Sequence, residues 1–412
     1  MKKKIGPLLL SGLMIGPILG SGIILLPPLA YGKLGNSAIW SWIVIMTLGA
    51  IFAMIFSKLS TMYPGDGGMT IAIEKSLGKK YKLYSSFLMI SAVSFGPTAV
   101  MLTASDYLNN LKSLSGVNVN YIAMGLVLVS LFILLKDIKF ISTLSFIFSS
   151  IITVIILISS IVVLSQNSIS ITPITDVQLM PLGKTVLLLF WAIIGWEIVG
   201  NYSEQVRDLK KTIPLATTFS LVIITITYIS LSLAIQSFKY TSELSLVNVL
   251  SPLFGNFSVT FLALLVSGLC IFTYLLIVGA LARLVNSLSV EGYLPRIFTK
   301  KNKDDIPVNS VLYFITVHLV VLLLVNLKIL SLELILSIAN GFFLANALIG
   351  LIASLKVIDG LVYKAGGIIL SISLFILLSF SSKSIFIAMI FVYFMAGYLE
   401  KKNFIAIESC EV

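Results

Sequence analysis

Charged residues are scarce in this sequence, and their scarcity decides the class of protein. Of the 412 residues, 11% are charged and 58% are hydrophobic, and the mean hydropathy is +1.07. Soluble domains carry about 25% charged residues, so a soluble fold of this length would lack the polar surface that it needs. The composition therefore predicts an integral membrane protein.

Residues that bind metals or act as nucleophiles are also few. The chain has one histidine, His318, and two cysteines, Cys270 and Cys410, none of them at metal-ligand or disulfide spacing. Membrane enzymes such as acyl or glycosyl transferases gather several ionisable groups at one interface, and no His/Asp or Cys/His cluster is evident here. The sequence therefore argues against an enzyme and predicts no catalytic residue, no cofactor and no metal site.

Long apolar runs recur from end to end of the chain. A helix needs about 20 apolar residues to cross a bilayer, whereas membrane β-strands are about 10 residues long and alternate polar with apolar. Although several runs are rich in Ile, Val and Thr, they are too long and too uniformly apolar for strands. No polar connection is long enough for a separate domain; the longest are 58–82, 236–255 and 289–306. We predict an all-α membrane protein with twelve transmembrane helices, at 6–31, 37–57, 83–110, 120–135, 140–165, 184–206, 213–235, 256–288, 307–327, 329–355, 360–381 and 384–399.

The net charge of +11 is spread through short loops and does not form the single basic patch of a nucleic-acid binder. Each loop after an odd-numbered span holds one lysine, while the other loops and the two ends hold the remaining 22 of the 28 Lys and Arg residues. Basic residues favour cytoplasmic loops. The pattern predicts a multi-pass protein of a bacterial cytoplasmic membrane with both termini in the cytoplasm. The six single lysines are Lys33, Lys112, Lys184, Lys239, Lys328 and Lys383.

Two spans contain helix-breaking residues near their middle. The first span has Pro17 followed by Gly20-Ser21-Gly22, and the sixth has Gly195 beside the acid Glu197. Glycine is permissive, proline lacks a backbone donor, and a charge at mid-membrane is expensive enough to suggest function. Other interpretations are a kinked or closely packed first helix, and an acid that caps an unwound turn in the sixth.

The two interrupted spans are five apart. Because five is odd, a five-span repeat must return inverted in the membrane, and matching interruptions in two inverted halves are the best sequence pointer to a transporter binding site. The two halves show no visible residue-level similarity. This prediction therefore depends on hydropathy and on the positions of the breaks.

At these residues the chain resembles the amino acid–polyamine–organocation (APC) superfamily of transporters. The resemblance covers residues 5–355 and consists of several short motifs in the right order. Within the superfamily the chain is most similar to the bacterial methionine and branched-chain amino acid exporters, by its length, Gly96-Pro97-Thr98-Ala99 and Ile338-Ala339-Asn340-Gly341. The wider motifs are Gly20-Ser21-Gly22-Ile23 with Leu26-Pro27, Pro64-Gly65-Asp66-Gly67-Gly68, Trp191-Ala192-Ile193-Ile194-Gly195-Trp196-Glu197, Ile213-Pro214, and Arg283 with Glu291-Gly292-Tyr293-Leu294-Pro295.

The resemblance implies a five-plus-five inverted repeat (LeuT-like) with broken helices one and six, and alternating access around a central site. The first repeat is expected at 5–165 and the second at 183–357, with two additional helices at 360–399. The expected substrate-binding residues are Ile18, Gly20, Ser21, Gly22, Ile23, Trp191, Ile194, Gly195 and Trp196.

A broken helix can hold both ends of an amino acid with backbone groups. Unpaired N–H groups at the start of the second half-helix attract anions, which assigns the substrate carboxylate to Ser21, Gly22 and Ile23. By the resemblance, the carbonyl groups of Ile18, Trp191 and Ile194 would hold the ammonium group. The side chains near the breaks are uncharged, which favours a neutral, apolar substrate.

Three further roles are expected. By its place in the family Trp191 is a gating aromatic, although both it and Trp196 could instead pack against neighbouring helices. Burial should favour the protonated form of Glu197 over its anion, which makes this residue the candidate for proton coupling. Glu204, Arg207 and Arg283 are candidates for an inner gate of ion pairs.

Two departures from the family weaken other kinds of coupling. No lysine lies within 140–165, where Lys139 only flanks the span, and the stretch from Leu275 to Ala282 has no hydroxyl for sodium, Thr273 being the nearest. These departures weaken the case for coupling through a lysine or to sodium. Substrate exchange and proton antiport through Glu197 remain as possible kinds of coupling. His318 lies in a span that is a scaffold in this fold.

We therefore expect a secondary active transporter of small neutral amino acids such as methionine and the branched-chain residues, and the resemblance to the exporters implies export or proton antiport. The alternatives are a transporter of amines, cationic or modified amino acids, and a sensor or channel on the same fold. The partners are then the substrate, the lipid bilayer and protons, with no nucleic acid.

Overall fold

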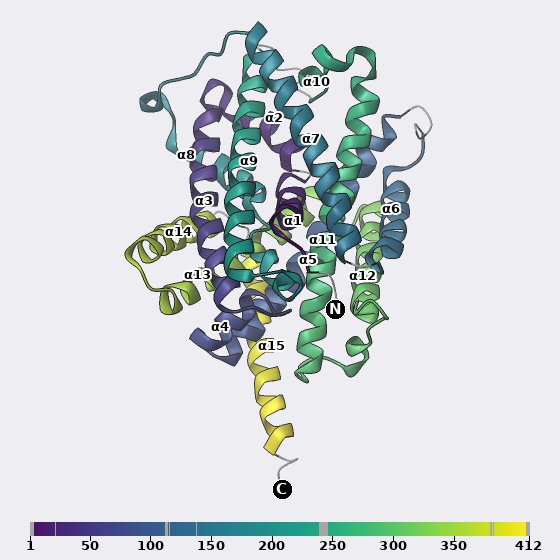
Figure 1. Cartoon of the computed structure of the whole chain (residues 1–412), viewed down its shortest axis with the longest axis vertical. Helices are drawn as coiled ribbons and strands as arrows, with labels where there is room; N and C mark the ends of the chain where they lie inside the picture. The colour runs from purple at the N-terminus through teal and green to yellow at the C-terminus, as the bar shows by residue number, and fades with distance from the viewer. Residues whose placement is uncertain are drawn as a thin grey trace.

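The chain is helical throughout the part that the structure describes. The computed structural model describes residues 4–20, 22–111, 114, 116–136, 138–238, 246–379, 381 and 383–408. Over these ranges it contains helices and two isolated β-bridges but no strand. Most of the long helices run along the longest axis of the molecule (Figure 1).

The helices follow one another with short connections. In chain order they are α1 (Pro7–Leu19), α2 (Gly22–Leu34), η1 (Gly35–Ser37), α3 (Ala38–Met62), α4 (Met69–Leu77), α5 (Lys79–Asn109), α6 (Val119–Leu134), α7 (Ile138–Gln166), η2 (Ile174–Asp176), α8 (Leu179–Leu189), η3 (Phe190–Ile193), η4 (Glu197–Gln205), α9 (Leu209–Ser237), α10 (Leu246–Phe254), η5 (Gly255–Phe257), α11 (Ser258–Val290), η6 (Arg296–Thr299), α12 (Val308–Asn326), α13 (Leu332–Val357), α14 (Leu361–Ser379) and α15 (Lys383–Glu408). The η elements are short 3₁₀ helices.

Eight helical stretches of the described chain are long and apolar enough to cross a membrane, by length and composition. Two more, Val119–Leu134 and Leu179–Ile193, are apolar but shorter. Each of the twelve predicted ranges coincides with a helix or with an interrupted pair of helices. The helical segments are therefore confirmed, while the number that cross the membrane stays a prediction.

Helices α5 and α11 form the middle of the bundle, where they pack against each other. Both are buried along most of their length. On the outer helices, large apolar side chains such as Phe132, Phe375 and Phe391 are exposed. An apolar exterior around a buried helical core, with backbone hydrogen bonds closed within each helix, suits a lipid environment.

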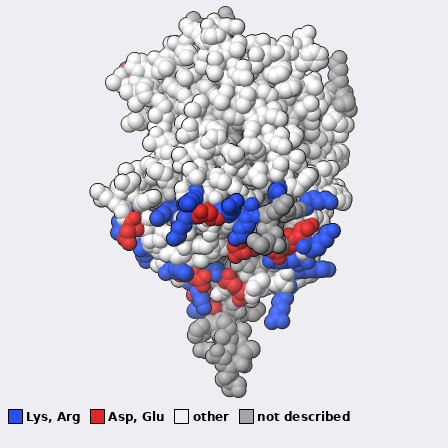
Figure 2. All heavy atoms as spheres, in the orientation of Figure 1, with Lys and Arg blue, Asp and Glu red and all other residues white. Residues whose placement is uncertain are grey.

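Charged side chains gather at one end of the molecule. Figure 2 shows Lys, Arg, Asp and Glu in a band towards the end from which α15 emerges in Figure 1, below a large surface with almost no charged side chain. Within this charged end the buried Lys82 of α5 lies 2.7 Å from Glu74 of α4 and 2.5 Å from Glu291 at the end of α11. One lysine thus joins three helices.

Two of the predicted polar connections contain short helices that the sequence analysis did not predict. Helix α4 lies within 58–82, and α10 lies within 236–255. Helix α4 is bounded by Gly68 and Gly78, whose φ angles of +57° and +95° reverse the chain at each end. Each of these helices has only nine residues, so a search for runs of membrane-spanning length does not detect it.

Candidate functional site

The first predicted span is broken at its glycines. Helix α1 ends at Leu19, and α2 begins at Gly22. Between them Gly20 has φ +32°, a conformation that glycine adopts readily, and its N–H still donates to the carbonyl of Gly16 at 2.8 Å. Ser21, one of the residues expected to hold a carboxylate, lies outside the described residues.

The sixth predicted span is broken in a different way. Helix α8 tightens into the 3₁₀ helix η3, Ile194 is extended, and Gly195 has φ +126°. The chain then continues as the 3₁₀ helix η4, where we expected an α-helix. A φ of +126° strains any residue with a Cβ atom, so this turn depends on Gly195.

The two breaks lie against each other in the bundle. A Cβ atom added to Gly195 would come within 3.1 Å of Ile18 Cγ1 and within 3.8 Å of Pro17 Cβ. The peptide groups of both breaks therefore lie in one region of the bundle. This arrangement makes a local polar site in an otherwise apolar interior.

Tyr228 of α9 bonds to the end of α1, and the sequence analysis did not find it. Its hydroxyl donates to the Ile18 carbonyl at 2.9 Å, with the Leu19 carbonyl at 3.4 Å. Its ring stacks on Trp42, with centroids 4.6 Å apart. The Ile18 carbonyl that was expected to hold an ammonium group thus already accepts a hydrogen bond in this conformation.

The hydroxyl of Thr273 supports the same break from α11. Thr273 Oγ1 donates to the Gly16 carbonyl at 3.1 Å. A Cβ atom on Gly20 would come within 2.8 Å of this hydroxyl. Two hydroxyls, one from α9 and one from α11, therefore satisfy carbonyl groups at the end of α1.

A small cavity lies beside the breaks. Its volume is about 10 Å³, roughly the minimum for one water molecule. Its walls come from both breaks and from α5, α11 and α13. The lining residues are Pro17, Gly96, Pro97, Trp191, Ile194, Thr273, Ile277 and Phe343; Thr273 contributes a hydroxyl and Trp191 an indole N–H, and none of the eight is charged.

Trp191 forms a wall between this cavity and a second one. The second cavity, of about 70 Å³, is lined by Trp191, Leu26, Thr103 and Asn340 among others. The Trp191 ring meets Phe343 edge-on, with centroids 6.4 Å apart. Trp191 is thus shared by the linings of both cavities, and its role as a gating aromatic stays a prediction.

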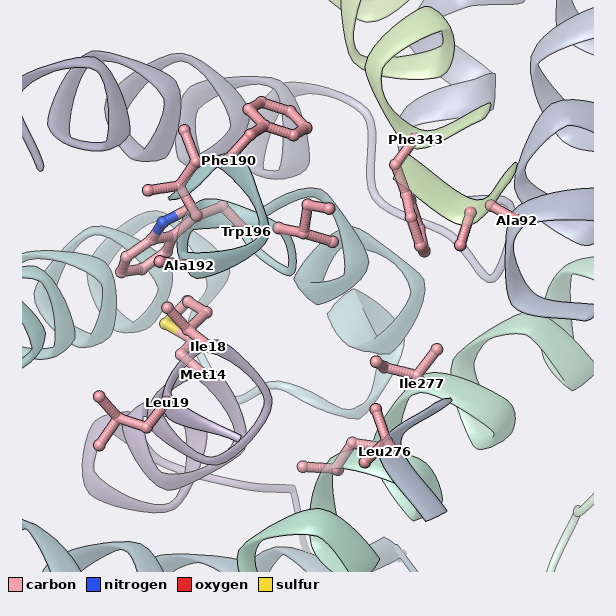
Figure 3. Packing of buried hydrophobic residues seen from close by; sticks show 14 of the residues in the cluster. Met14, Ile18, Leu19, Ala92, Phe190, Ala192, Trp196, Leu276, Ile277 and Phe343 are labelled. Atoms are coloured by element: carbon pink, nitrogen blue, oxygen red, sulfur yellow. The ribbon is translucent and has the colours of Figure 1, made fainter. Parts of the chain in front are cut away.

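Trp196 lies on the other side of the break. Figure 3 shows its indole on the side of α1 where Met14 and Ile18 lie, and Phe343 and Ile277 on the opposite side. Trp196 is buried but does not line the small cavity. The alternative interpretation, packing against a neighbouring helix, fits its position.

Glu197 turns back onto its own break. Its carboxylate oxygen Oε2 accepts from the Gly195 N–H at 3.1 Å, and the residue is 3% exposed. No basic side chain of the described residues forms an ion pair with it. This is the capping arrangement that the sequence left open, and a protonated carboxyl group could keep it, since its carbonyl oxygen still accepts.

The predicted gate residues are not paired with one another in the described part of the chain. Arg283 Nη1 lies 3.8 Å from Asp66, and its guanidinium stands 5.9 Å from the Tyr202 ring. Glu204 and Arg207 are exposed and form no ion pair among the described residues. Arg283 is therefore paired with Asp66 of the glycine-rich loop at 64–68. The sequence analysis singled out both motifs but did not predict that they pair.

Backbone contacts close the charged end beneath the breaks. The Ile5 N–H donates to the backbone carbonyl of Gln205 at 2.9 Å, and the Arg207 N–H donates to the backbone carbonyl of Ile5 at 3.0 Å. Asn201 Nδ2 donates to the Asp66 carbonyl at 2.8 Å. The start of the chain, the loop at 64–68 and the end of η4 are thus held together.

The structure brings most of the predicted site residues into one region. Ile18, Gly20, Gly22, Trp191, Ile194 and Gly195 lie at or beside the two breaks, and Ile23 follows in the first turn of α2. The sequence analysis missed Tyr228, Phe343 and Ile277. A tyrosine in an apolar span is only a weak signal of a functional residue. Nothing in the sequence indicates that the Tyr228 hydroxyl contacts α1.

Comparison with known proteins agrees with these features. The sequence profile of the amino acid permease family matches residues 5–406. The uncharacterized amino acid permease YecA of Bacillus subtilis is 22% identical over 65% of this chain and 64% of YecA. The L-methionine/branched-chain amino acid exporter YjeH of Escherichia coli is 21% identical over 79% of each chain. The cadaverine/lysine antiporter of Escherichia coli is 24% identical over 75% of this chain and 72% of the antiporter.

The profile covers nearly the whole chain, and the relatives are transporters rather than enzymes. The chain belongs to the amino acid permease family, a group of transmembrane amino acid transporters within the APC superfamily.

Proposed function

We propose that the protein is a secondary active carrier of neutral amino acids with apolar side chains, such as methionine and the branched-chain residues. The observation that carries the proposal is the meeting of two helix breaks beside a cavity with uncharged walls. The breaks supply peptide N–H and carbonyl groups, and the walls supply apolar surface. The charged ends of a zwitterionic amino acid need the peptide groups, and its apolar side chain needs the apolar walls.

The carrier works by alternating access in a twelve-helix fold with a five-plus-five inverted repeat. The repeats comprise 5–165 and 183–357, and residues 360–399 add two helices. Packing within the bundle supports this division. Helix α3 packs against α9, α5 against α11 and α6 against α12. The members of each pair are five spans apart, as expected for equivalent helices that flank a two-fold axis.

Both termini face the cytoplasm of a bacterial cell. The charged band of Figure 2 lies at the end where the C-terminal helix emerges. Its lysines and arginines suit the cytoplasmic side of a membrane, because basic residues are retained there.

The substrate binds with its carboxylate at the start of α2 and its ammonium group at the ends of α1 and η3. N–H groups of Ser21, Gly22 and Ile23 hold the carboxylate, since the first turn of a helix has unpaired donors. The carbonyl groups of Ile18, Trp191 and Ile194 receive the ammonium group. Tyr228 then gives up its bond to Ile18.

Binding also requires the central cavity to enlarge. A volume of about 10 Å³ cannot hold an amino acid. Trp191 and Phe343, which face each other across the cavity, are the side chains whose rotation would open it. Substrate entry and gate movement are therefore one event.

Proton antiport through Glu197 is the coupling that the geometry favours. The carboxyl group is buried, contacts the break through Gly195, and can change protonation without a basic partner. An exporter driven by inward proton movement would use this group. Glu204, Arg207 and Arg283 belong to the inner gate, with Asp66 as the partner of Arg283.

A carrier of amines or of cationic amino acids is the competing assignment, because one relative is a cadaverine/lysine antiporter. A cationic side chain would need an acid in the wall of the cavity. None of the residues that line either cavity beside Trp191 is acidic. The wall therefore favours the neutral substrate.

The test is counterflow in liposomes that contain the purified protein and unlabelled methionine. We expect saturable uptake of labelled methionine that leucine and isoleucine inhibit and that Gly22→Leu abolishes. Uptake should respond to a pH gradient in the native protein and lose that response in Glu197→Gln. Inhibition by lysine or cadaverine instead of leucine would move the assignment to cationic substrates, and a pH response that survives in Glu197→Gln would remove the proton role.

A further inference from the structure

A large crevice lies on the outside of the bundle, away from the helix breaks. Its volume is about 740 Å³, within the range of roughly 300–1,000 Å³ that is usual for small-molecule sites. Helices α3, α9 and α14 form its walls, and in Figure 1 these three labels lie in the same part of the molecule. The crevice is much larger than either cavity beside Trp191.

Two lysines with no acidic partner line this crevice. They are Lys58 of α3 and Lys210 in the first turn of α9, both exposed. Neither forms an ion pair with a carboxylate of the described residues. The nearby Lys211 and Lys364, by contrast, pair with Asp208 and Asp359.

Residues with hydroxyl groups line the same crevice. Thr61 and Thr218 line the crevice, and so does Tyr363 near the start of α14. Helices α9 and α14 both begin here, at Leu209 and Leu361. Helix N-termini offer free N–H groups and a partial positive charge, so their effect adds to that of the lysines.

The surface that leads away from the lysines is apolar. Along α9 the side chains of Leu215, Phe219, Val222 and Ile226 are exposed at helical spacing on one face. A ligand that combines an anionic head with a long apolar part would fit both regions. A free anion would contact only the crevice with the two lysines.

We propose that this crevice binds an anionic phospholipid of the leaflet at the charged end, with its phosphate between Lys58 and Lys210 and its acyl chains along α9. Basic pockets between transmembrane helices on the cytoplasmic side are known to hold anionic head groups. The crevice borders α3 and α9, the helices that carry Trp42 and Tyr228. The bound lipid would therefore sit against helices that support the first break.

The experiment is native mass spectrometry of the purified, delipidated full-length protein titrated with phosphatidylglycerol or phosphatidylcholine. We expect the protein to bind phosphatidylglycerol in preference to phosphatidylcholine. The double variant Lys58→Gln/Lys210→Gln should weaken that binding about 30-fold, since each lysine near an anionic lipid contributes about fivefold. Thr218→Trp keeps both lysines but fills the crevice, and should also abolish the preference.

The matched control is Lys136→Gln/Lys300→Gln, which removes the same charge from two exposed positions outside the crevice that, like Lys58 and Lys210, follow even-numbered predicted spans. It should bind phosphatidylglycerol as the native protein does. Equal weakening in both double variants, or native binding in Thr218→Trp, would overturn the proposal. Displacement of phosphatidylglycerol by millimolar inorganic phosphate would also overturn it, because the site would then recognise a soluble anion rather than a lipid.

Discussion

The Nε2 atom of His318 lies 2.7 Å from the carbonyl oxygen of Val93 in the interior of the bundle. Pro97, four residues after Val93 in α5, has no N–H to donate to that carbonyl. His318 supplies the missing donor from α12, and its Nδ1 atom, 2.8 Å from the Tyr274 hydroxyl, accepts in turn. The single histidine is therefore a structural tie that α5 needs because of its proline.

This relationship predicts an unusual rescue. His318→Phe should leave the Val93 carbonyl and the Tyr274 hydroxyl unpaired, at about 1–3 kcal/mol each. Adding Pro97→Ala should recover part of the loss, because alanine restores the N–H to Val93. The measurement is thermal unfolding followed with a thiol-reactive dye at the buried Cys270, in a Cys410→Ser background.

Pro214→Ala in α9 is the control, since it restores an N–H at a site with no contact to His318. It should not rescue His318→Phe. Additive effects of His318→Phe and Pro97→Ala would contradict the role given to the histidine.

Gly22 and Gly32, which lie in the same helix, should respond differently to alanine. A Cβ atom on Gly22 would lie 2.8 Å from the Tyr228 hydroxyl, whereas one on Gly32 would meet nothing within 4 Å. Gly22→Ala would place a methyl group at the start of α2, where the substrate carboxylate is proposed to bind, and should reduce methionine counterflow at least tenfold, while Gly32→Ala transports normally. Equal transport by the two variants would show that the first break tolerates a side chain and is not the binding site.

Tyr228→Phe should tighten substrate binding. The hydroxyl donates to the Ile18 carbonyl, and phenylalanine removes that donor while keeping the stack on Trp42. A substrate ammonium group then meets a free acceptor, and the gain should be about 2- to 13-fold in affinity, the usual net range for one hydrogen bond. Binding of labelled methionine to purified protein measures this, and weaker binding would mean that Tyr228 assists the substrate instead of competing with it.

Acid should loosen the contact between Asp66 and Arg283. Burial disfavours the anion and raises the pKa of Asp66 above its ordinary 3.8, while Arg283 opposes this shift. As the pH falls through the raised pKa, Asp66 becomes neutral and its attraction to Arg283, 3.8 Å away, is lost.

Acid weakens the attraction between Asp66 and Arg283, but it increases the contribution of Asp66 to the stability of the folded state. Because the folded state binds this proton more readily than the unfolded state, the contribution of Asp66 to stability increases as the pH falls from the raised pKa towards 3.8. Acid should therefore open the gate without unfolding the protein. The labelling rate of a Thr273→Cys variant from the charged end, divided by that of an exposed Arg207→Cys variant to remove the pH dependence of the thiolate, should rise at low pH. Asp66→Asn should show the raised ratio at every pH.

The helices and their breaks could be predicted from sequence because both depend on neighbouring residues. Runs of apolar residues set the helices, and Gly20, Gly22 and Gly195 mark where the two breaks occur. The 3₁₀ winding of 197–205 could not be predicted, because it depends on how close η4 comes to other elements. A Cβ atom on Gly200, for example, would lie 3.2 Å from the backbone of Gly68.

The partners of the site residues could not be predicted for the same reason. Tyr228 lies 210 residues from Ile18, and Thr273 lies 257 residues from Gly16. An apolar span gives no periodic signal for which hydroxyl meets which carbonyl. The sequence motif containing Asp66 was visible, but its ion pair with Arg283 depends on how two distant segments fold together.

One indole ring separates the two central cavities, and this has an electrical consequence. Trp191 lines both cavities, and the smaller one, of about 10 Å³, has room for about one water molecule. In the proposed carrier, where water would reach the site from one side at a time, the membrane voltage would fall mainly across the layer at Trp191, and each unit charge that crosses it would do about 2.3 kcal/mol of work per 100 mV. A zwitterion that crosses alone is indifferent to voltage. Any proton carried in exchange feels nearly all of it, so the resting potential of the cell, as well as its pH gradient, would drive the carrier.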